Sequence, residues 1–329
     1  MQTKTIYFYR NNKAGYSVAK VMNTITSEIS KSKQIEEYYV PEYRAGLLHI
    51  VKNIFFVIRH RDRKGVNHIT GDIHYCLVGL IGCKSVLTIH DLSAYKFTNN
   101  KLKKWVVKLL WFDIPLLIAD KVVCISETIR EELYEITDRR DAVVIYNALQ
   151  TNFKTVYREF NINKPTILQI GTAWNKNLKR VIESLNGINC HFRIIGKINS
   201  DLKSILEGNN IDYSADHDLS DDEIVNEYIN CDIVSFCSLY EGFGMPIIEA
   251  NKVGRSVITS NINPMKEISN GSAILVNPNN VDSIRFAFQN IIFNSELRTK
   301  LIEVGFNNSL KFEVKEIAKK YINLYKELI

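Results

Sequence analysis

Short apolar runs alternate with amphipathic stretches along the whole chain. Apolar and β-branched runs bounded by polar residues predict buried strands, and segments with apolar positions at helical spacing predict helices between them. We expect strands at 5–9, 85–89, 119–126, 142–147, 165–171, 192–196 and 232–238, and helices at 17–29, 127–134, 178–185, 224–229, 247–253 and 311–329. This alternation predicts an α/β fold. The two blocks meet near residue 150, so we expect two Rossmann-like domains, residues 1–150 and 151–312.

Residues 231–260 contain the most informative unit. The strand at 232–238 is followed by a loop with two glycines, which let the backbone approach a ligand closely. Pro246 is suited to the first position of the next helix, and Gly254 to the position just after its end. Such a unit turns free backbone amides and the positive end of a helix dipole toward the carboxyl edge of a sheet. This arrangement suits a phosphate or another anion.

Two carboxylates flank the loop. Glu241 precedes the glycines and Glu249 lies near the first turn of the helix. A carboxylate accepts hydrogen bonds side by side, so it pairs well with the vicinal hydroxyls of ribose or of a hexose. A diphosphate between two diols describes a nucleotide sugar. An ordinary βα turn with two solvated glutamates explains the same residues equally well, so this pattern leaves both interpretations open.

The segment EGFGMPIIEA resembles the signature of the retaining family 4 glycosyltransferases of GT-B fold. The resemblance continues through GRSVITSN, Pro264–Glu267 and Ala273–Asn280, and so covers the C-terminal half. It implies two Rossmann-like domains facing across a central cleft. In such enzymes the terminal helix often crosses back, so 313–329 can belong with the first domain. It also implies that Glu241 contacts the donor sugar, that Glu249 holds the ribose, and that the loop residues face the sugar and diphosphate: Gly242, Phe243, Gly244 and Met245.

A second element follows the strand at 165–171. Lys176 lies at the mouth of a βα turn, where it can offer a positive charge to a diphosphate. GTAWNKNL is similar to the family's element of glycine, spacer, Lys-Asn and Leu, which implies donor contacts for Gly171, Thr172 and Lys176. The family often has arginines shortly after the glycine and just before the lysine. Here Thr172 and Asn175 stand at those positions, so fewer cations meet the diphosphate.

The N-terminal half offers candidates at strand ends. His90 and Asp91 follow the strand at 85–89, where ligand groups gather in open α/β sheets. A lone histidine is more often structural, but TIHDL looks like the family's cleft motif. That resemblance implies that His90 contacts the transferred sugar and that Asp91 supports it or contacts the acceptor. Asp72 and His74, after another short strand, are further acceptor candidates.

The resemblance also implies a further donor-site glycine and a set of catalytic residues. Gly15, in the first strand–loop–helix unit, is similar to the family's glycine-containing N-terminal loop and is a donor-site candidate. His90, Glu241 and Lys176 are the expected catalytic residues. No D-x-D triad or acidic cluster stands out, so we expect no metal and no other cofactor, with the leaving diphosphate stabilised by Lys176, loop amides and the helix dipole.

Composition limits the remaining possibilities. The chain of 329 residues, with 24% charged and 46% hydrophobic residues, has the size and composition of a soluble two-domain protein. Six cysteines without C-x-x-C spacing are expected to be reduced core thiols, not a zinc site. The first ten residues lack a leader pattern and no apolar run is long enough to cross a bilayer, so we expect a cytoplasmic protein.

The positive charge is concentrated in the N-terminal half. Residues 1–150 hold 22 Lys and Arg against 15 Asp and Glu. Residues 49–65 and 101–112 combine basic side chains with apolar ones, and the second segment adds Trp105 and Trp111, which fits helices lying on an anionic membrane surface. A core-packed helix with solvated lysines is the alternative.

We therefore predict transfer of a hexose from a nucleotide sugar to a lipid-linked bacterial surface glycan, with the protein peripheral on the inner face of the cytoplasmic membrane. A non-catalytic, glycosyltransferase-like docking subunit is the second hypothesis. A nucleic-acid-binding role lacks a recognisable motif and is not expected. A phosphorylase of the same fold needs a pyridoxal-binding lysine context, which we do not find.

Overall fold

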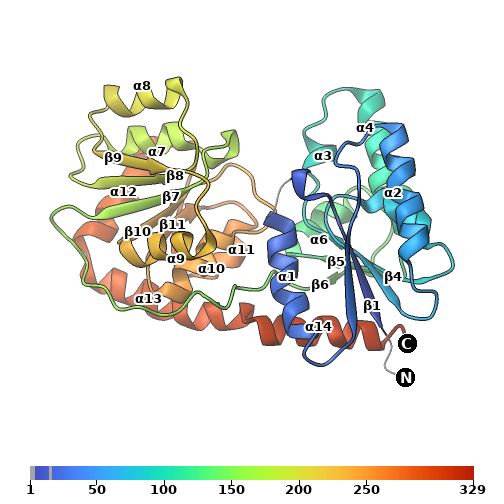
Figure 1. The fold of residues 1–329 in the computed structure, drawn as a ribbon. Helices are drawn as coiled ribbons and strands as arrows, with labels where there is room; N and C mark the ends of the chain where they lie inside the picture. Colours follow the sequence, from blue (N-terminus) through green and yellow to red (C-terminus); the bar gives the residue numbers. More distant parts are fainter. Residues whose placement is uncertain (1–3, 15–16) are drawn as a thin grey trace. The chain divides into compact units, whose positions relative to one another are not determined.

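The computed structural model describes residues 4–14 and 17–329, and the chain divides into two compact units (Figure 1). Unit 1 comprises residues 1–150 and 313–329, and unit 2 comprises residues 151–312. Each unit is built on a six-stranded, fully parallel sheet. Parallel strands with helical crossovers are what the alternating pattern predicts.

The sheet of unit 1 has the strand order β2-β1-β3-β4-β5-β6. Its strands are β1 Thr5–Tyr9, β2 Ile35–Tyr39, β3 Val66–Ile69, β4 Lys84–Ile89, β5 Lys121–Cys124 and β6 Val143–Val144. The α-helices are α1 Ser17–Ile29, α2 Leu47–His60, α3 Ser93–Lys96, α4 Lys101–Lys108, α5 Ile114–Ile118, α6 Glu127–Tyr134 and α14 Val314–Lys326. Shorter helical segments are η1 Asn12–Ala14, η2 His74–Leu80 and the π-helical turn η3 Leu109–Asp113.

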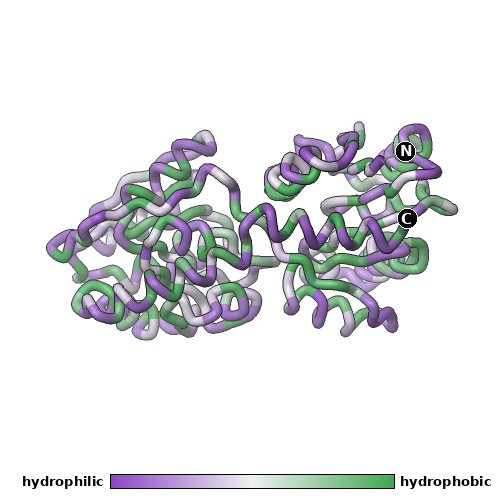
Figure 2. Tube along the Cα trace, turned by 90° about the horizontal axis from the view of Figure 1, so that it is seen from below, coloured by the Kyte–Doolittle hydropathy of each residue, from purple (hydrophilic) through white to green (hydrophobic). Residues whose placement is uncertain are grey.

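A network of buried hydrogen bonds connects α14 to the sheet of unit 1. Nδ1 of His68 and the hydroxyl of Tyr7 each lie 2.8 Å from the hydroxyl of Tyr325. Nε2 of His68 lies 2.7 Å from the hydroxyl of Thr88, which is 3.4 Å from that of Tyr321. Hydrophobic and hydrophilic residues alternate along α14 (Figure 2), its buried residues include Ile317, Tyr321 and Tyr325, and the helix packs against α1. The C-terminal helix therefore folds as part of unit 1.

The sheet of unit 2 has the order β12-β11-β10-β7-β8-β9. Its strands are β7 Thr166–Ile170, β8 His191–Ile195, β9 Tyr213–Asp216, β10 Ile233–Phe236, β11 Ser256–Ser260 and β12 Ala273–Val276. Its helices are α7 Leu178–Leu185, α8 Ser200–Gly208, α9 Asp221–Asn230, α10 Met245–Val253, α11 Met265–Ser269, α12 Val281–Phe293 and α13 Ser295–Ser309, with the 3₁₀ turns η4 Trp174–Lys176 and η5 Leu310–Phe312. Ile167, Phe192 and Phe288 belong to a buried core between this sheet and α7 and α12.

Local sequence signals placed most elements correctly. Ser126 caps α6, its hydroxyl accepting from the amide of Ile129, and Ser220 forms a capping box with Glu223. Gly254 ends α10 in the left-handed conformation. The helix begins at Met245, however, so Pro246 is its second residue. All six cysteines are free and buried, as expected for core thiols.

Candidate functional site

The strand order of unit 2 defines where a ligand is expected. The chain winds outward from β7 through β8 to β9 on one side and through β10, β11 and β12 on the other. The switch point therefore lies between β7 and β10. In open α/β sheets, ligands bind beyond the carboxyl ends of the strands at this point. The loops after β7 and β10 carry the predicted Lys176 and Glu241.

An ion pair bridges the switch point of unit 2. Nζ of Lys176 lies 2.7 Å from Oε1 of Glu241, and their side chains are 19% and 16% exposed. Gly171 has a φ of +88°, and a Cβ built on it would lie 2.9 Å from Cε of Lys176. The absence of a side chain at Gly171 thus lets Lys176 lie across the turn. Below it, Nζ sits 5.0 Å from the ring centre of Phe236.

Two asparagine side chains hydrogen-bond the loop after β7 to the segments around the Lys176–Glu241 pair. Nδ2 of Asn175 donates to the carbonyl of Tyr240 at 2.9 Å and to Oε1 of Glu241 at 3.3 Å. Asn177 is buried in the left-handed conformation with a φ of 59°, and its Nδ2 donates to the carbonyls of Cys237 and Pro278. Sequence reasoning missed Asn177. The residue type was the one clue in the sequence, because asparagine tolerates the left-handed conformation and its side chain hydrogen-bonds to nearby backbone groups.

The glycine loop leads directly into α10. Gly244, with a φ of 137°, precedes the first residue of the helix, which brings the helix N-terminus to the loop. Glu249 lies one turn further on. The hydroxyl of Tyr228, on α9, donates to Oε2 of Glu249 at 2.5 Å. Sequence reasoning did not single out Tyr228, because nothing local connects a tyrosine on one helix with a glutamate on the next.

The N-terminal unit brings its own candidates to one edge. Its strand order places a switch point between β1 and β3. Arg10 follows β1 and Asp72 follows β3, and their side chains meet at 3.5 Å. These two residues, with His74, His90 and Asp91, are among those that line a cavity of about 130 Å³. Trp111, from η3, also lines the cavity, and its indole nitrogen donates to the carbonyl of Asp72 at 2.6 Å.

His90 is a buried side chain with an unsatisfied nitrogen. Its Nε2 is inaccessible to water and has no hydrogen-bond partner among the described residues. Burial lowers the pKa of His90 to about 4, which the nearby charge of Asp91 only partly offsets. The imidazole is therefore neutral at physiological pH. His90 lines the cavity, and a buried polar atom without a partner calls for an explanation, of which a bound ligand is one.

The other N-terminal candidates have structural partners. Nδ1 of His74 donates to the carbonyl of Trp111 at 2.7 Å, and burial lowers the pKa of His74. Asp91 accepts hydrogen bonds from the amide and the hydroxyl of Ser93, which shape the turn into α3. Asp72 is exposed. Gly15 lies outside the described residues.

Comparisons with known proteins relate unit 2 to a sequence family. The sequence pattern of the family described as "Glycosyl transferases group 1" matches residues 154–307, which make up nearly all of unit 2. Unit 2 therefore carries the sequence pattern of the group 1 glycosyltransferases.

Curated relatives extend the similarity over both units. An uncharacterized glycosyltransferase of Methanocaldococcus jannaschii is 25% identical over 99% of this chain and 91% of its own. The O-antigen chain mannosyltransferase RfbU of Salmonella typhimurium is 24% identical over 85% of this chain and 77% of its own.

Solved structures show the fold. HepE of Anabaena, in complex with UDP and glucose, superposes with a TM-score of 0.80 at 15% identity and covers 99% of this chain and 100% of its own. WaaG, a glycosyltransferase involved in lipopolysaccharide biosynthesis, superposes with a TM-score of 0.74 at 11% identity and covers 98% and 99%. The predicted GT-B fold, with two Rossmann-like α/β domains, is confirmed.

In unit 2 the two positions where the family often has arginine hold structural roles. Asn175 fixes the loop before the glycines, as described above. Thr172 packs against the next loop, since a Cβ on Gly196 would lie 2.7 Å from its methyl group. Arg180, one turn beyond Lys176, donates to Oδ1 of Asn177 at 3.0 Å. Neither Thr172 nor Asn175 adds a positive charge to the site.

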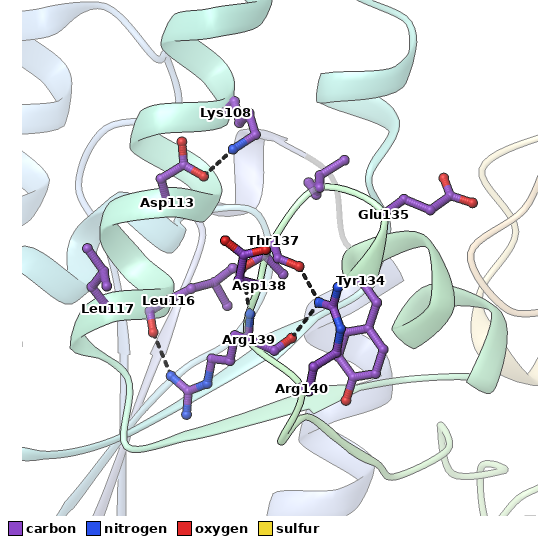
Figure 3. A pocket seen from close by; sticks show the side chains of 11 residues that line it. Lys108, Asp113, Leu116, Leu117, Tyr134, Glu135, Thr137, Asp138, Arg139 and Arg140 are labelled. Carbon is purple, nitrogen blue, oxygen red and sulfur yellow. Dashed lines mark hydrogen bonds and ion pairs between the residues drawn. The ribbon is translucent and has the colours of Figure 1, made fainter.

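A larger cavity in unit 1 lies elsewhere. It measures about 470 Å³ and is lined by residues that precede β5 and β6, so it is at the amino edge of the sheet. Figure 3 shows its side chains bonded to one another or to backbone, with Lys108 on Asp113 and Arg139 on the carbonyl of Leu116. Arg140 lies over the ring of Tyr134. Because its cations already have internal partners, this cavity is a poor candidate for the active site.

Two further features concern metal binding and membrane spanning. Between residues 4 and 329, outside positions 15 and 16, no three His, Cys, Asp or Glu side chains gather in a way that could hold a metal ion. Over the same residues, no helix has both the length and the apolar character needed to cross a membrane.

Proposed function

We propose that this chain is a retaining, metal-independent glycosyltransferase that moves a hexose from a nucleotide-diphosphate sugar to a hydroxyl of a lipid-linked bacterial surface glycan, such as O-antigen or capsule. The observation that carries the proposal is the Lys176–Glu241 pair at the switch point of unit 2. At this point Lys176 can offer a positive charge to a diphosphate, and Glu241 beside it can accept hydrogen bonds from sugar hydroxyls. The names of RfbU and WaaG support a surface glycan as the acceptor class.

Each donor group has a proposed partner in unit 2. Lys176 and the amides of Gly242–Met245, at the N-terminus of α10, receive the diphosphate. Glu241 accepts hydrogen bonds from hydroxyls of the sugar, and Glu249 accepts them from the ribose. Gly171 and Thr172 line the turn beside Lys176. His90, in unit 1, is proposed to contact the transferred sugar through its unsatisfied Nε2.

The proposed reaction is an attack from the face that the diphosphate leaves. The acceptor oxygen forms a bond to the anomeric carbon while the bond from that carbon to the diphosphate oxygen breaks, so the configuration is retained. The departing phosphate oxygen takes the proton of the acceptor hydroxyl. Lys176, the loop amides and the helix dipole stabilise the negative charge that develops on the diphosphate, so no metal ion is required.

Unit 1 is proposed to supply the acceptor side and the contact with an anionic membrane. Asp72, His74 and Asp91 border the cavity near His90 and are the proposed acceptor-facing residues. The outward side of α2 is apolar and lies beside basic residues such as Lys52 and Arg59, which suits peripheral binding to anionic lipid. The site of action follows as the inner face of the cytoplasmic membrane.

A non-catalytic docking subunit is the second candidate. Thr172 and Asn175, where arginines are often found, favour it because they leave the diphosphate with fewer cations. The Lys176–Glu241 pair and the unsatisfied nitrogen of His90 favour the enzyme.

Lys176→Ala provides the decisive comparison. The test measures thermal shifts with UDP, GDP and ADP and with their sugar conjugates, followed by turnover with the sugar nucleotide that binds. We expect one nucleotide to stabilise the protein, and Lys176→Ala to lower turnover about 100-fold, the usual cost of removing one group that stabilises the developing charge. Turnover should persist in EDTA, and NMR should show a product with the donor's anomeric configuration.

Lys179→Ala is the matched control, because Lys179 is exposed on the next turn and its removal should leave turnover unchanged. Equal turnover of the Lys176→Ala variant and the parent protein would refute the diphosphate role. No shift with any nucleotide and no transfer would favour the docking subunit.

A further inference from the structure

A buried tyrosine contacts the carboxylate that is proposed to hold the ribose. Tyr228 lies on α9 with its ring fully buried, and Glu249 lies half-buried on α10. The phenol donates to Oε2 of Glu249 at 2.5 Å, a short distance typical of a hydrogen bond to a charged acceptor. One oxygen of the Glu249 carboxylate is therefore hydrogen-bonded to a side chain of the neighbouring helix α9.

The tyrosine itself is fixed on several sides. Its ring meets that of Phe153 edge to face, with ring centres 5.3 Å apart. Its carbonyl accepts from Nε of Arg255 at 3.1 Å, and the same guanidinium binds the carbonyl of Ile229 at 2.8 Å. The hydroxyl of Tyr228 therefore has little freedom to move away from Glu249.

The phenol remains a donor under all ordinary conditions. Burial raises the pKa of Tyr228 well above its usual value, and the negative charge of Glu249 raises it further. A carboxylate has about four acceptor positions on its two oxygens. A carboxylate that accepts from one phenol can in general also accept from two neighbouring hydroxyls.

We propose that Tyr228 is a positioning residue that orients Glu249 toward both hydroxyls of the donor ribose, so that the site selects ribonucleotides over deoxyribonucleotides. The inference rests on the proposed function, which gives Glu249 the ribose. Without the phenol the Glu249 side chain gains rotamer freedom, and its two oxygens no longer match the spacing of a vicinal diol. Tyr228 touches neither the substrate nor the reacting atoms.

Tyr228→Phe tests this, because phenylalanine keeps the ring against Phe153 and removes only the hydroxyl. The measured quantities are the dissociation constants of UDP, GDP and ADP and of their 2′-deoxy and 3′-deoxy forms. For whichever base binds, we expect ribonucleotide affinity to fall about tenfold, or about 1.4 kcal/mol. The preference for ribose over either deoxyribose should shrink toward unity. KM for the donor should rise while kcat stays within about twofold.

Three variants separate positioning from general destabilisation. Phe153→Leu loosens the packing of the ring but keeps the hydroxyl, so it should lower thermal stability and reduce the ribose preference less than Tyr228→Phe does. Tyr134→Phe removes a hydroxyl that donates to a carbonyl in unit 1 and should change neither quantity. The double variant Tyr228→Phe/Glu249→Ala should bind no more weakly than Glu249→Ala alone, because the tyrosine acts through the carboxylate.

The outcomes distinguish this inference from the proposed function. If Glu249→Ala weakens ribonucleotide binding and Tyr228→Phe leaves both affinity and preference unchanged, the positioning role is overturned and the donor site stands. If no nucleoside diphosphate binds the parent protein, or Glu249→Ala has no effect, the proposed function fails and the role of Tyr228 fails with it.

Discussion

At the residue scale, the donor half of the site depends on backbone positions that only glycine fills without strain. Gly171 has a positive φ, and the Lys176 side chain occupies the space where a Cβ would project. Gly187 has a similar φ of +80°, but a Cβ there would meet nothing within 4 Å. The two glycines therefore share the conformational requirement and differ in steric surroundings.

Gly171→Ala should separate these two effects. Alanine at this φ costs about 1–3 kcal/mol of stability, and the added methyl should also displace Lys176 from Glu241. We expect a lower melting temperature together with weaker nucleotide binding. Gly187→Ala is the control and should lower the melting temperature without changing nucleotide binding. Unchanged binding in Gly171→Ala would mean that the position of Lys176 does not matter for the donor.

At the residue scale, the sequence predicted which side chains belong to the donor site but not which side chains they contact. Lys176 and Glu241 were predicted because each stands in a recognisable loop motif. Their ion pair was not predicted, since it joins loops 65 residues apart in the chain. The supporting Asn177 and Tyr228 were missed for the same reason. A hydrogen bond between distant segments leaves no local periodicity or spacing to find.

At the element scale, α2 is a helix with apolar side chains on both of its sides. Its buried stripe is narrow and consists of Ile50, Asn53 and Val57, with Asn53 donating to the hydroxyl of Tyr75 at 2.9 Å. Its outward side exposes five large apolar residues, Leu47, Leu48, Val51, Phe55 and Ile58. A helix that is apolar all round is ordinarily buried in protein or in lipid. α4 also exposes apolar side chains, Leu102 and Trp105, beside its lysines.

The outward side of α2 should bind vesicles that contain phosphatidylglycerol. We expect the protein to float with such vesicles and less with phosphatidylcholine alone, because basic residues flank the apolar side. Leu48→Ser/Phe55→Ser should weaken binding at least about tenfold, since each large side chain withdrawn from water contributes about 1.5–3 kcal/mol.

Stability should change little in that variant, because both side chains are exposed, at 75% and 66%. Phe293→Ser, at an exposed aromatic residue of unit 2, is the control and should float like the parent. Flotation without preference for the anionic lipid would contradict the charge argument, and no flotation would contradict the surface itself.

At the scale of the whole molecule, the chain builds two doubly wound sheets and returns its last helix to the first of them. α14 brings Tyr321 and Tyr325 to the buried His68 of unit 1. Burial lowers the pKa of His68 to about 3 and that of His90 to about 4. Both side chains are therefore neutral in the folded protein over a wide range of pH.

These histidines should make unit 1 sensitive to acid. In the unfolded chain they take up protons as the pH falls below about 6.5, whereas in the folded protein they do so only near 4 and 3. The unfolded state thus binds more protons over this window, so the free energy of unfolding should fall as the pH drops from about 6.5 to 4. Above that window they contribute no pH dependence.

Urea unfolding measures this effect, followed by the fluorescence of Trp105 and Trp111 in a Trp174→Phe background. His68→Gln should make the loss of stability between pH 6.5 and 4 shallower than in the parent. His217→Gln, at an exposed position in unit 2, should leave the slope unchanged. Identical slopes for His68→Gln and the parent would show that His68 is not held neutral by burial.

The sequence by itself determined the α/β class, the positions of most strands and helices, and the loop motifs of the donor site. These features are local: a buried strand, a capping serine or a glycine with positive φ is specified by a few neighbouring residues. Only the tertiary structure decided which side of α2 faces outward, which tyrosine holds Glu249 and where α14 packs. Burial and hydrogen bonding of these side chains depend on contacts between segments 21 to 318 residues apart, and such contacts exist only in the folded chain.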